Sequence, residues 1–258
     1  MTEHVKIAIA DGILHITFAR PEKKNALTQA MYVAVGEALA RAESDPAVRV
    51  VLIDSEGDSF TAGNDIADFA AIATGARSRD QMQTHIFLEA LAHGTKPYVA
   101  AVAGLAVGVG VTMLMHCDVS YVAEDARLST PFVNLALVPE AASTMLIPAR
   151  IGYARAFQMF AFGEPLDGKS AAAMGLVTAA LPAAEVRPKA LAAAKALAAK
   201  PAGALQTTKK LMRDPAAMLA VMAREGEAFG HRLRTAEAAE AFRAFAERRA
   251  PDFTKIQG

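Results

Sequence analysis

The fold is decided by the stretch VAGLAVGVGVTMLMHCD at residues 102–118, which joins a strand, a glycine loop and an apolar helix. The loop glycines are Gly104, Gly108 and Gly110, and we expect the helix at about residues 110–115. This spacing matches neither a GxGxxG loop nor a loop ending in Gly-Lys-Ser/Thr, so nucleotide phosphate binding is disfavoured. The free N–H groups and the positive dipole end of a helix start favour an oxyanion site instead. Glycines that only allow close helix packing explain the stretch equally well.

Strand and helix patterns alternate on both sides of this stretch. Residues 5–10 and 13–18 alternate apolar with polar or small side chains around Asp11-Gly12, which predicts a β-hairpin with a tight turn. Thr28 can cap a helix that runs to about Ser44. The other expected elements are a strand at residues 48–54, a helix at 79–93, and strands at 98–103 and 119–122. Strands that alternate with helices indicate α/β units.

The last quarter of the chain has a different pattern. Beyond Gly175 the strand signals vanish apart from residues 176–178, while good helix formers dominate residues 183–249, with breaks near Pro201 and Pro215. This pattern predicts a helical C-terminal region. Its apolar positions need a partner, either the core of the same chain or a neighbouring subunit. These positions are Phe229, Leu233, Phe242 and Phe245.

The composition is that of an ordinary globular protein, with 53% hydrophobic and 21% charged residues among 258. The 27 Lys and Arg residues balance the 27 Asp and Glu residues, so there is no global electrostatic reason to expect nucleic acid or an anionic membrane as a partner. The single cysteine, Cys117, cannot form an internal disulfide and is expected to be a buried, inert thiol. The N-terminal sequence lacks a secretory signal pattern, and glycines interrupt the apolar residues 98–115, so we expect a cytoplasmic protein without a membrane span.

A second segment, SFTAGNDIADF at residues 59–69, follows a predicted strand. Ala62 and Gly63 have a small side chain or none, so the backbone there can come close to a ligand. Small residues beside Asn and Asp are also ordinary loop material, and the spacing alone leaves both interpretations open.

A third segment, STPFVNLALVPEAASTMLIPARIG at residues 129–152, places Glu140 between Pro139 and a predicted apolar helix. The helix dipole favours a carboxylate at such a position, and this structural role is the alternative to a functional one. Apolar neighbours would desolvate the carboxylate and raise its proton affinity, which suits a base that takes and returns a carbon-bound proton. These neighbours are Leu137, Val138, Met145 and Leu146.

The spacing of other candidate residues does not support a metal site or a serine nucleophile. His85, His93 and His116 have no partner at metal-ligand spacing. Ser129 and Ser143 have no recognisable histidine partner. We therefore expect no metal.

Together and in this order, the three segments resemble the crotonase (enoyl-CoA hydratase/isomerase) superfamily. Its usual pattern is a (Ser/Ala)-Gly-x-Asp loop, then a glycine-rich loop that opens a helix, then a Pro or Pro-Glu segment before another helix. Supporting features are RPEKKNAL at residues 20–27, Lys96-Pro97 before the expected third strand, and MGLVTAALP at residues 174–182. The resemblance covers nearly the whole chain.

The resemblance implies an α/β fold, the crotonase (ClpP-like) spiral of repeated ββα units with a C-terminal helical region. Residues 1–195 would form the spiral core with the coenzyme A thioester site. Residues 196–258 would form the helical region for oligomerisation and active-site cover. The expected assembly is a homotrimer or hexamer. The substrates would be acyl-CoA thioesters, and no cofactor is expected because coenzyme A is part of the substrate.

The catalytic acids distinguish the subfamilies. Hydratases of the superfamily use two glutamates, and the matching positions here hold Thr112 and Phe132, which disfavours efficient hydration. The three segments look like those of peroxisomal-type Δ3,Δ2-enoyl-CoA isomerases, which use one glutamate after proline, and Glu140 has that position. The resemblance therefore implies an isomerase that converts 3-enoyl-CoA to trans-2-enoyl-CoA. The alternatives are an enoyl-CoA hydratase, which is a lyase of fatty acid β-oxidation, and a catalytically silent acyl-CoA binding protein.

By the same resemblance, the N–H groups of Ala62 and Val109 would hold the thioester oxygen. The superfamily usually has Gly in place of Val109, so this donor requires backbone angles that suit a β-branched residue. Lys23, and further along the chain Lys209 or Lys255, are candidates for binding the coenzyme A moiety and its phosphates. The expected substrate-binding residues are Lys24, Asn25, Ala26, Gly63, Asn64, Asp65, Ile66, Gly108, Phe132 and Pro139.

Overall fold

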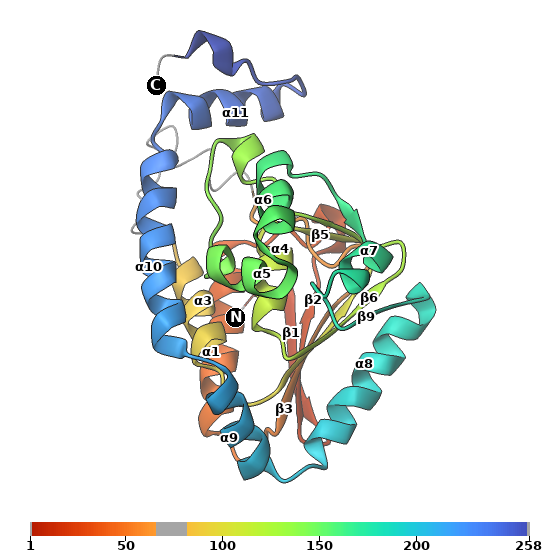
Figure 1. Cartoon of the computed structure of the whole chain (residues 1–258). Coiled ribbons are helices and arrows are strands. Elements are labelled where there is room, and N and C mark those ends of the chain that lie inside the picture. Colours follow the sequence, from red (N-terminus) through yellow and green to blue (C-terminus); the bar gives the residue numbers. More distant parts are fainter. Residues whose placement is uncertain (1, 66–81, 257–258) are drawn as a thin grey trace.

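A six-stranded sheet forms the centre of the molecule (Figure 1). The computed structural model describes residues 2–65 and 82–256. The strands of this sheet are β1 (Val5–Ala10), β2 (Ile13–Phe18), β3 (Val50–Ser55), β4 (Tyr98–Val102), β6 (Val119–Ala123) and β9 (Ala179–Leu181), in the order β1-β2-β3-β4-β6-β9. β1 and β2 pair antiparallel, and the other neighbours pair parallel. Parallel pairs need crossover connections, which helices supply here.

The predicted N-terminal hairpin is confirmed. Asp11 and Gly12 form its two-residue turn with φ values of 53° and 75°, the positive angles that such turns require. The predicted cap is also confirmed, because the Thr28 side chain accepts a hydrogen bond from the N–H of Met31 at the start of the first long helix.

A second, three-stranded sheet continues from the glycine loop. It contains β5 (Leu105–Val107), β7 (Arg127–Ser129) and β8 (Leu166–Asp167), in the order β5-β7-β8. β5 pairs parallel with β7, and β7 pairs antiparallel with β8. The stretch at residues 102–118 therefore leaves one sheet, enters the other and then turns into a helix.

Helices cover the main sheet and build the C-terminal region. Figure 1 shows α1 and α3 on one side of this sheet and α8 on the other. The α-helices are α1 (Gln29–Ser44), α3 (Thr84–His93), α4 (Val109–Thr112), α5 (Ser143–Ile151), α6 (Tyr153–Phe162), α7 (Gly168–Ala173), α8 (Ala183–Ala198), α9 (Ala202–Met212), α10 (Pro215–Arg232) and α11 (Ala236–Ala246). The short 3-10 helices are η1 (Pro21–Lys23), η3 (Met113–His116), η4 (Val133–Leu135) and η5 (Phe253–Lys255).

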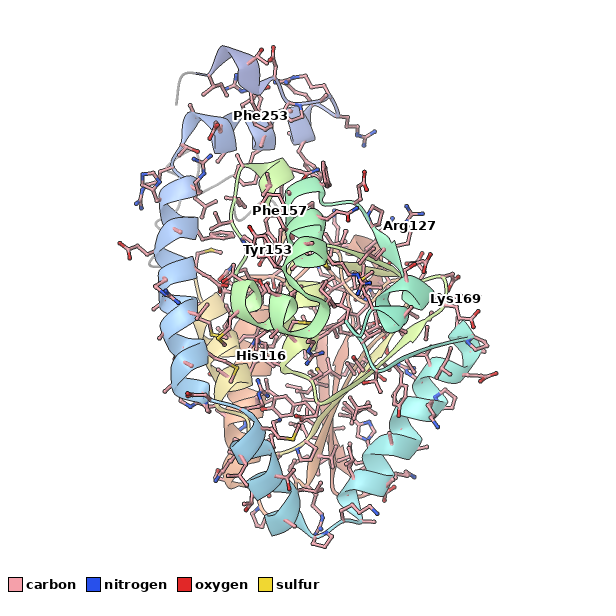
Figure 2. The ribbon with its side chains drawn as sticks, in the orientation of Figure 1. His116, Arg127, Tyr153, Phe157, Lys169 and Phe253 are labelled. Atoms are coloured by element: carbon pink, nitrogen blue, oxygen red, sulfur yellow. The ribbon has the colours of Figure 1, made fainter. Side chains whose placement is uncertain are left out.

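The hydrophobic core lies between the main sheet and the helices on its two faces. Figure 2 shows side chains filling this space. Strands β3 and β4 are almost entirely buried, as their near-continuous apolar sequences predict for parallel strands covered on both faces. The largest fully buried side chains include Tyr32, Tyr98, Phe18, Phe60 and Phe87.

The structure differs from the sequence-based expectations at a few boundaries. The predicted strand at residues 176–178 is wrong, because Leu176 and Val177 are buried outside any strand and β9 begins at Ala179. The helix expected from residue 110 begins at Val109 and changes after Thr112 to the tighter η3. The helix expected from residue 79 is described from Thr84 onward, and its predicted start lies outside the described residues.

The C-terminal helices pack partly on their own chain. The expected division after residue 195 falls inside α8, which contacts β3, β4 and β6. Leu233 and Phe242 are buried together with Phe132 and Leu137, so the same chain is their partner. Phe245, in contrast, is 56% exposed. Within the described residues no helix combines the length and the apolar character that crossing a membrane requires.

Candidate active site

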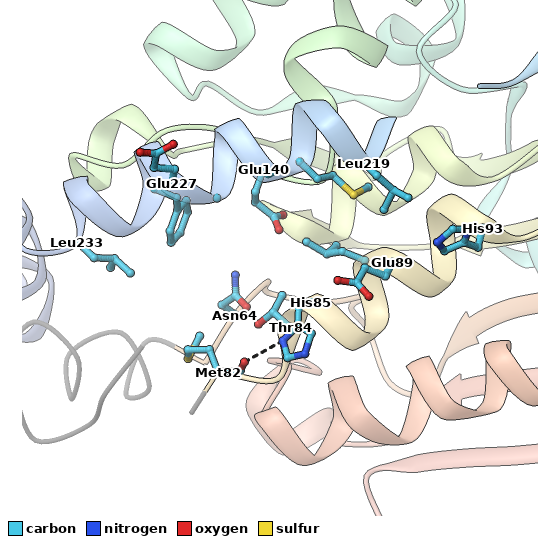
Figure 3. Close-up of a pocket in the computed structure, with 15 residues that line it drawn as sticks. Asn64, Met82, Thr84, His85, Glu89, His93, Glu140, Leu219, Glu227 and Leu233 are labelled. Carbon is cyan, nitrogen blue, oxygen red and sulfur yellow. Dashed lines mark hydrogen bonds between the residues drawn. The ribbon is translucent and has the colours of Figure 1, made fainter. Parts of the chain in front are cut away.

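A cavity of about 920 Å³ opens between α3 and α10, and Glu140 lies on its wall (Figure 3). Most of the wall facing Glu140 comes from these two helices. The lining residues are Asn64, Met82, Thr84, His85, Leu88, Glu89, His93, Glu140, Leu219, Met222, Ala223, Gly226, Glu227, Phe229 and Leu233. A mainly apolar hollow with a few convergent polar groups is typical of a small-molecule site.

Glu140 is desolvated, as its apolar sequence neighbours predict. The residue is buried, with only 8% of its surface exposed. The pKa of Glu140 is raised to about 7, chiefly because burial disfavours the charged form; a hydrogen bond from Thr112 lowers the pKa and the charge of Glu225 raises it. A carboxyl with a pKa near 7 exchanges protons readily at neutral pH, which suits a general acid–base group.

The first residue of α4 has a backbone N–H that can bind a ligand. Gly108 has φ 55° and ψ −115°, a conformation that requires glycine, and it turns the chain into the helix. The N–H groups of Val111 and Thr112 both donate to the Gly108 carbonyl. Within the described residues, the N–H of Val109 has no hydrogen-bond partner. Val109 needs only helical angles here, so a β-branched residue is compatible with the donor role.

Residues 59–65 lie beside the stretch at residues 102–118. The N–H of Thr61 donates to Leu105 O at 3.0 Å, and the N–H of Val107 donates to Thr61 O at 3.0 Å. A Cβ on Gly63 would lie 2.8 Å from Val107 O, so only glycine allows this approach. The structure thus brings together the two segments that the sequence motifs single out.

The donor role expected for Ala62 is corrected by the structure. The N–H of Ala62 donates to Lys24 O at 2.8 Å, so it is already engaged. Asn64, two residues later, pairs with Leu27 in a parallel β-bridge. Its two hydrogen bonds run from the Leu27 N–H to Gly63 O and from the Asp65 N–H to Leu27 O, so neither uses the N–H of Asn64. Within the described part of the chain, the N–H of Asn64 has no partner, and the residue lines the cavity. Among the described residues, Asn64 and Val109 therefore each have a backbone N–H without a partner.

Comparison with known proteins identifies the family. The enoyl-CoA hydratase/isomerase family model matches residues 8–256. The chain belongs to the enoyl-CoA hydratase/isomerase family. It is 35% identical over 205 residues to the rat (Rattus norvegicus) enoyl-CoA delta isomerase 2, a match that covers 78% of this chain but only 52% of the rat protein. It is 32% identical over 257 residues to a probable enoyl-CoA hydratase of Bacillus subtilis, with 96% and 98% of the two chains covered.

A solved structure of the family agrees with the fold. The crystal structure of an enoyl-CoA hydratase/isomerase from Pseudoalteromonas atlantica T6c superposes with a TM-score of 0.91 at 37% identity and covers 98% of this chain and 100% of that one. The chain therefore has the crotonase fold that the sequence resemblance implied. Family membership makes it an enoyl-CoA hydratase/isomerase-type enzyme, whereas relatives of both names leave the individual reaction open.

The loop at residues 20–27 does not line the cavity but hydrogen-bonds with residues 56–65. Asn25 is fully buried, and its side chain donates to Glu56 O and Ser59 O while accepting from the N–H of Arg20. The expectation that Asn25 contacts substrate is therefore corrected, because its polar atoms already hold the loop together. Lys24 is exposed with a left-handed backbone, φ 49°, and Ala26 is half-buried.

The other expected substrate-binding residues that the structure describes lie in several different environments. Asp65 pairs with Arg20 at 2.8 Å, and Phe132 is 5% exposed and packs against Phe160. Gly108 and Pro139 are half-buried and do not line the described cavity. Ile66 lies outside the described residues. Of the predicted site residues, the cavity wall includes Asn64 and Glu140.

The phosphate role considered for Lys209 is wrong. Its ammonium is buried, donates to Asp118 at 2.7 Å and to Lys96 O at 2.7 Å, and lies over the Tyr98 ring. A buried, paired lysine is not available to a phosphate in solution. Lys23 is exposed at the end of η1, and the side chain of Lys255 lies outside the part described.

Sequence reasoning missed several groups that shape this family site. Tyr32 donates a hydrogen bond to the Asn64 side-chain oxygen at 2.5 Å, which leaves the amide NH₂ of Asn64 as the donor on the cavity side. Thr84 also lines the cavity, and its buried hydroxyl has no hydrogen-bond partner within the described residues. Neither residue belongs to a motif, so only the fold could reveal them. The described residues contain no group of three or more potential metal ligands.

Proposed function

We propose that this enzyme is a Δ3,Δ2-enoyl-CoA isomerase in which Glu140 is the single acid/base. The observation that carries the proposal is the buried Glu140 carboxyl on the cavity wall, with a pKa of about 7 and the Thr112 hydroxyl as its neighbour. A two-carboxylate site would position a water molecule between two acids. Here a hydroxyl and the buried ring of Phe132 occupy the two positions where hydratases would carry glutamates.

The chemistry needs one group that takes a proton and returns it. The Glu140 carboxylate takes a proton from the α-carbon of a 3-enoyl-CoA, and the electron pair moves into the thioester to give a dienolate. The N–H groups of Asn64 and Val109 donate to the dienolate oxygen. Glu140 then returns the same proton to the γ-carbon, which gives the conjugated 2-enoyl-CoA with no net gain or loss of atoms. One such oxyanion donor contributes roughly 3 kcal/mol to transition-state stabilisation.

An absorbance assay tests this proposal. Purified enzyme is incubated with 3-hexenoyl-CoA and, separately, with crotonyl-CoA, and each reaction is repeated with Glu140→Gln. Conjugated product from 3-hexenoyl-CoA, lost in the variant, supports the isomerase. Faster loss of conjugation from crotonyl-CoA than formation from 3-hexenoyl-CoA would favour hydration instead. Coenzyme A binding with neither reaction would favour a silent binding protein.

The proposed assembly is a homotrimer or hexamer, as the family resemblance implies. Sedimentation equilibrium of the purified chain measures it directly. A monomer at micromolar concentration would contradict it.

A further inference from the structure

The loop that carries Glu140 has an unfavourable backbone. Ala141 and Ala142 have φ values of 65° and 56°, so two consecutive alanines adopt the left-handed conformation. Residues with a Cβ avoid this region because of steric clashes. Surrounding contacts must therefore hold this loop in place.

Glu225 of α10 supplies contacts on one side of the loop. The Glu225 residue is 6% exposed, and its carboxylate accepts hydrogen bonds from the N–H of Ala142 at 2.6 Å, the N–H of Thr144 at 2.9 Å and the Thr144 hydroxyl at 2.5 Å. Ala142 is the residue before α5 and has no side chain that can cap the helix. Glu225 therefore caps α5 from another helix, and its negative charge suits the positive end of the α5 dipole.

His116 supplies a contact on the other side of the loop. Its fully buried ring donates from Nε2 to Ala141 O at 2.8 Å and accepts at Nδ1 from Arg213 at 3.0 Å. Burial first, and then the Arg213 charge, lower the pKa of His116 to about 3. The ring is therefore neutral at the pH values at which a carboxylate base works, and it keeps this one donor orientation.

The helix that holds Glu225 also forms the cavity wall. Leu219, Met222 and Phe229 on α10 line the cavity on the same helix as Glu225. Through these hydrogen bonds, Glu225 connects α10, which forms the cavity wall, to the loop that carries Glu140.

We propose that Glu225 is a positioning residue for Glu140: by capping α5 across the molecule it fixes the backbone of residues 140–144 and so the place of the Glu140 carboxylate. This inference rests on the proposed function, in which Glu140 is the base. Among the described residues, Glu140 interacts with the Thr112 hydroxyl from α4 through a hydrogen bond and with Glu225 from α10 through its charge. His85, Glu89 and His93 of α3 and Glu227 of α10 are exposed on the same cavity.

Glu225→Gln tests the inference, with Glu185→Gln as the matched control. Glu185 is exposed in the first turn of α8 and lies outside the cavity. We expect Glu225→Gln to lower kcat for 3-hexenoyl-CoA at least tenfold and to change KM less than threefold. We also expect the acid limb of its kcat/KM profile to move to lower pH, because a negative charge that disfavours ionised Glu140 is removed. Glu185→Gln should match the unchanged enzyme in both readouts.

Thr144→Val and Glu140→Gln complete the design. Thr144→Val removes one contact of Glu225 and keeps the charge, so kcat should fall less than in Glu225→Gln and the acid limb should stay in place. If Glu225→Gln does not fold, unchanged kcat in Thr144→Val overturns the inference and a reduced kcat supports it. Turnover retained by Glu140→Gln would refute the proposed function itself. Turnover lost in Glu140→Gln but unaltered in Glu225→Gln would refute only the positioning role.

Discussion

Thr112 Oγ1 donates a hydrogen bond to Glu140 Oε1 at 3.0 Å, and both residues are buried. This contact favours the ionised carboxylate and so opposes the burial that raises the pKa of Glu140. A hydroxyl at this place lowers the pKa of Glu140, but it cannot itself accept a proton from a substrate as a carboxylate does. In the proposed mechanism the pair supplies one carboxylate base and one hydroxyl that donates to it.

Replacing Thr112 should shift the pH dependence of turnover upward. Thr112→Val removes the hydrogen bond that favours ionised Glu140, so the pKa of Glu140 should rise by about one to two units, given that hydrogen bonds to charged groups contribute roughly 1.5–3 kcal/mol. The acid limb of the kcat/KM profile measures this shift. Thr112→Ser keeps the hydroxyl and should keep the limb near pH 7. A limb in Thr112→Val that stays or moves to lower pH would contradict the role of this contact.

Glu140 should destabilise the folded enzyme as the pH rises. Its folded pKa of about 7 lies above the unfolded value of 4.5, so the folded state binds more protons between these values and stability is lost as the pH rises through this window. The Glu140→Gln variant has no carboxyl to ionise at this position, so it does not lose stability in this way as the pH rises. Relative to the unchanged enzyme, the free energy of unfolding of Glu140→Gln should rise by about 3 kcal/mol between pH 4 and pH 8. Urea unfolding at both pH values measures it, and a pH-independent difference would contradict the buried, titrating carboxyl.

Removing the N–H of Val109 should impair chemistry more than folding. Val109 is the first residue of α4, a position where proline fits a helix, so Val109→Pro deletes the donor without breaking the helix. We expect kcat to fall roughly 100- to 1,000-fold, the range seen when one oxyanion donor is lost. Val109→Ala retains the N–H and serves as the control for the lost side-chain volume. Equal kcat values in the two variants would rule out the donor role.

Cys117 should be unreactive in the folded protein. Its thiol is 2% exposed, and burial raises its pKa to about 12, so almost no thiolate forms at neutral pH. We expect no labelling by iodoacetamide at pH 8 and complete labelling in denaturant, as measured by mass spectrometry. Rapid labelling of the native protein would show that the core around Cys117 opens.

The parts of the site that depend on local backbone chemistry could be predicted from the sequence. The glycine loop, the small residues at 62–63 and the glutamate after Pro139 lie in short segments whose residue types themselves impose the geometry. Gly108 illustrates this, because its backbone conformation requires glycine. Apolar neighbours likewise predicted the desolvation of Glu140, which burial confirms.

The parts that depend on contacts between distant segments could not be predicted. Which N–H stays free in the loop at residues 61–65 is decided by the carbonyl of Lys24, which engages Ala62 and leaves Asn64. Glu225 belongs to none of the three segments, and the sequence around His116, near the end of the stretch at residues 102–118, does not indicate its contact with the loop of Glu140. Their meeting at the loop of Glu140 follows only from how α10 and η3 pack around it.

The most direct test of a single acid/base follows the proton itself. 3-Hexenoyl-CoA carrying two deuterium atoms at the α-carbon is converted in ordinary water, and the 2-hexenoyl-CoA is examined by mass spectrometry and NMR. Because Glu140 is buried and would carry the abstracted deuteron to the γ-carbon, we predict deuterium at the γ-carbon of the product, lost together with turnover in Glu140→Gln. A γ-carbon that carries only solvent hydrogen, with turnover retained in Glu140→Gln, would contradict it.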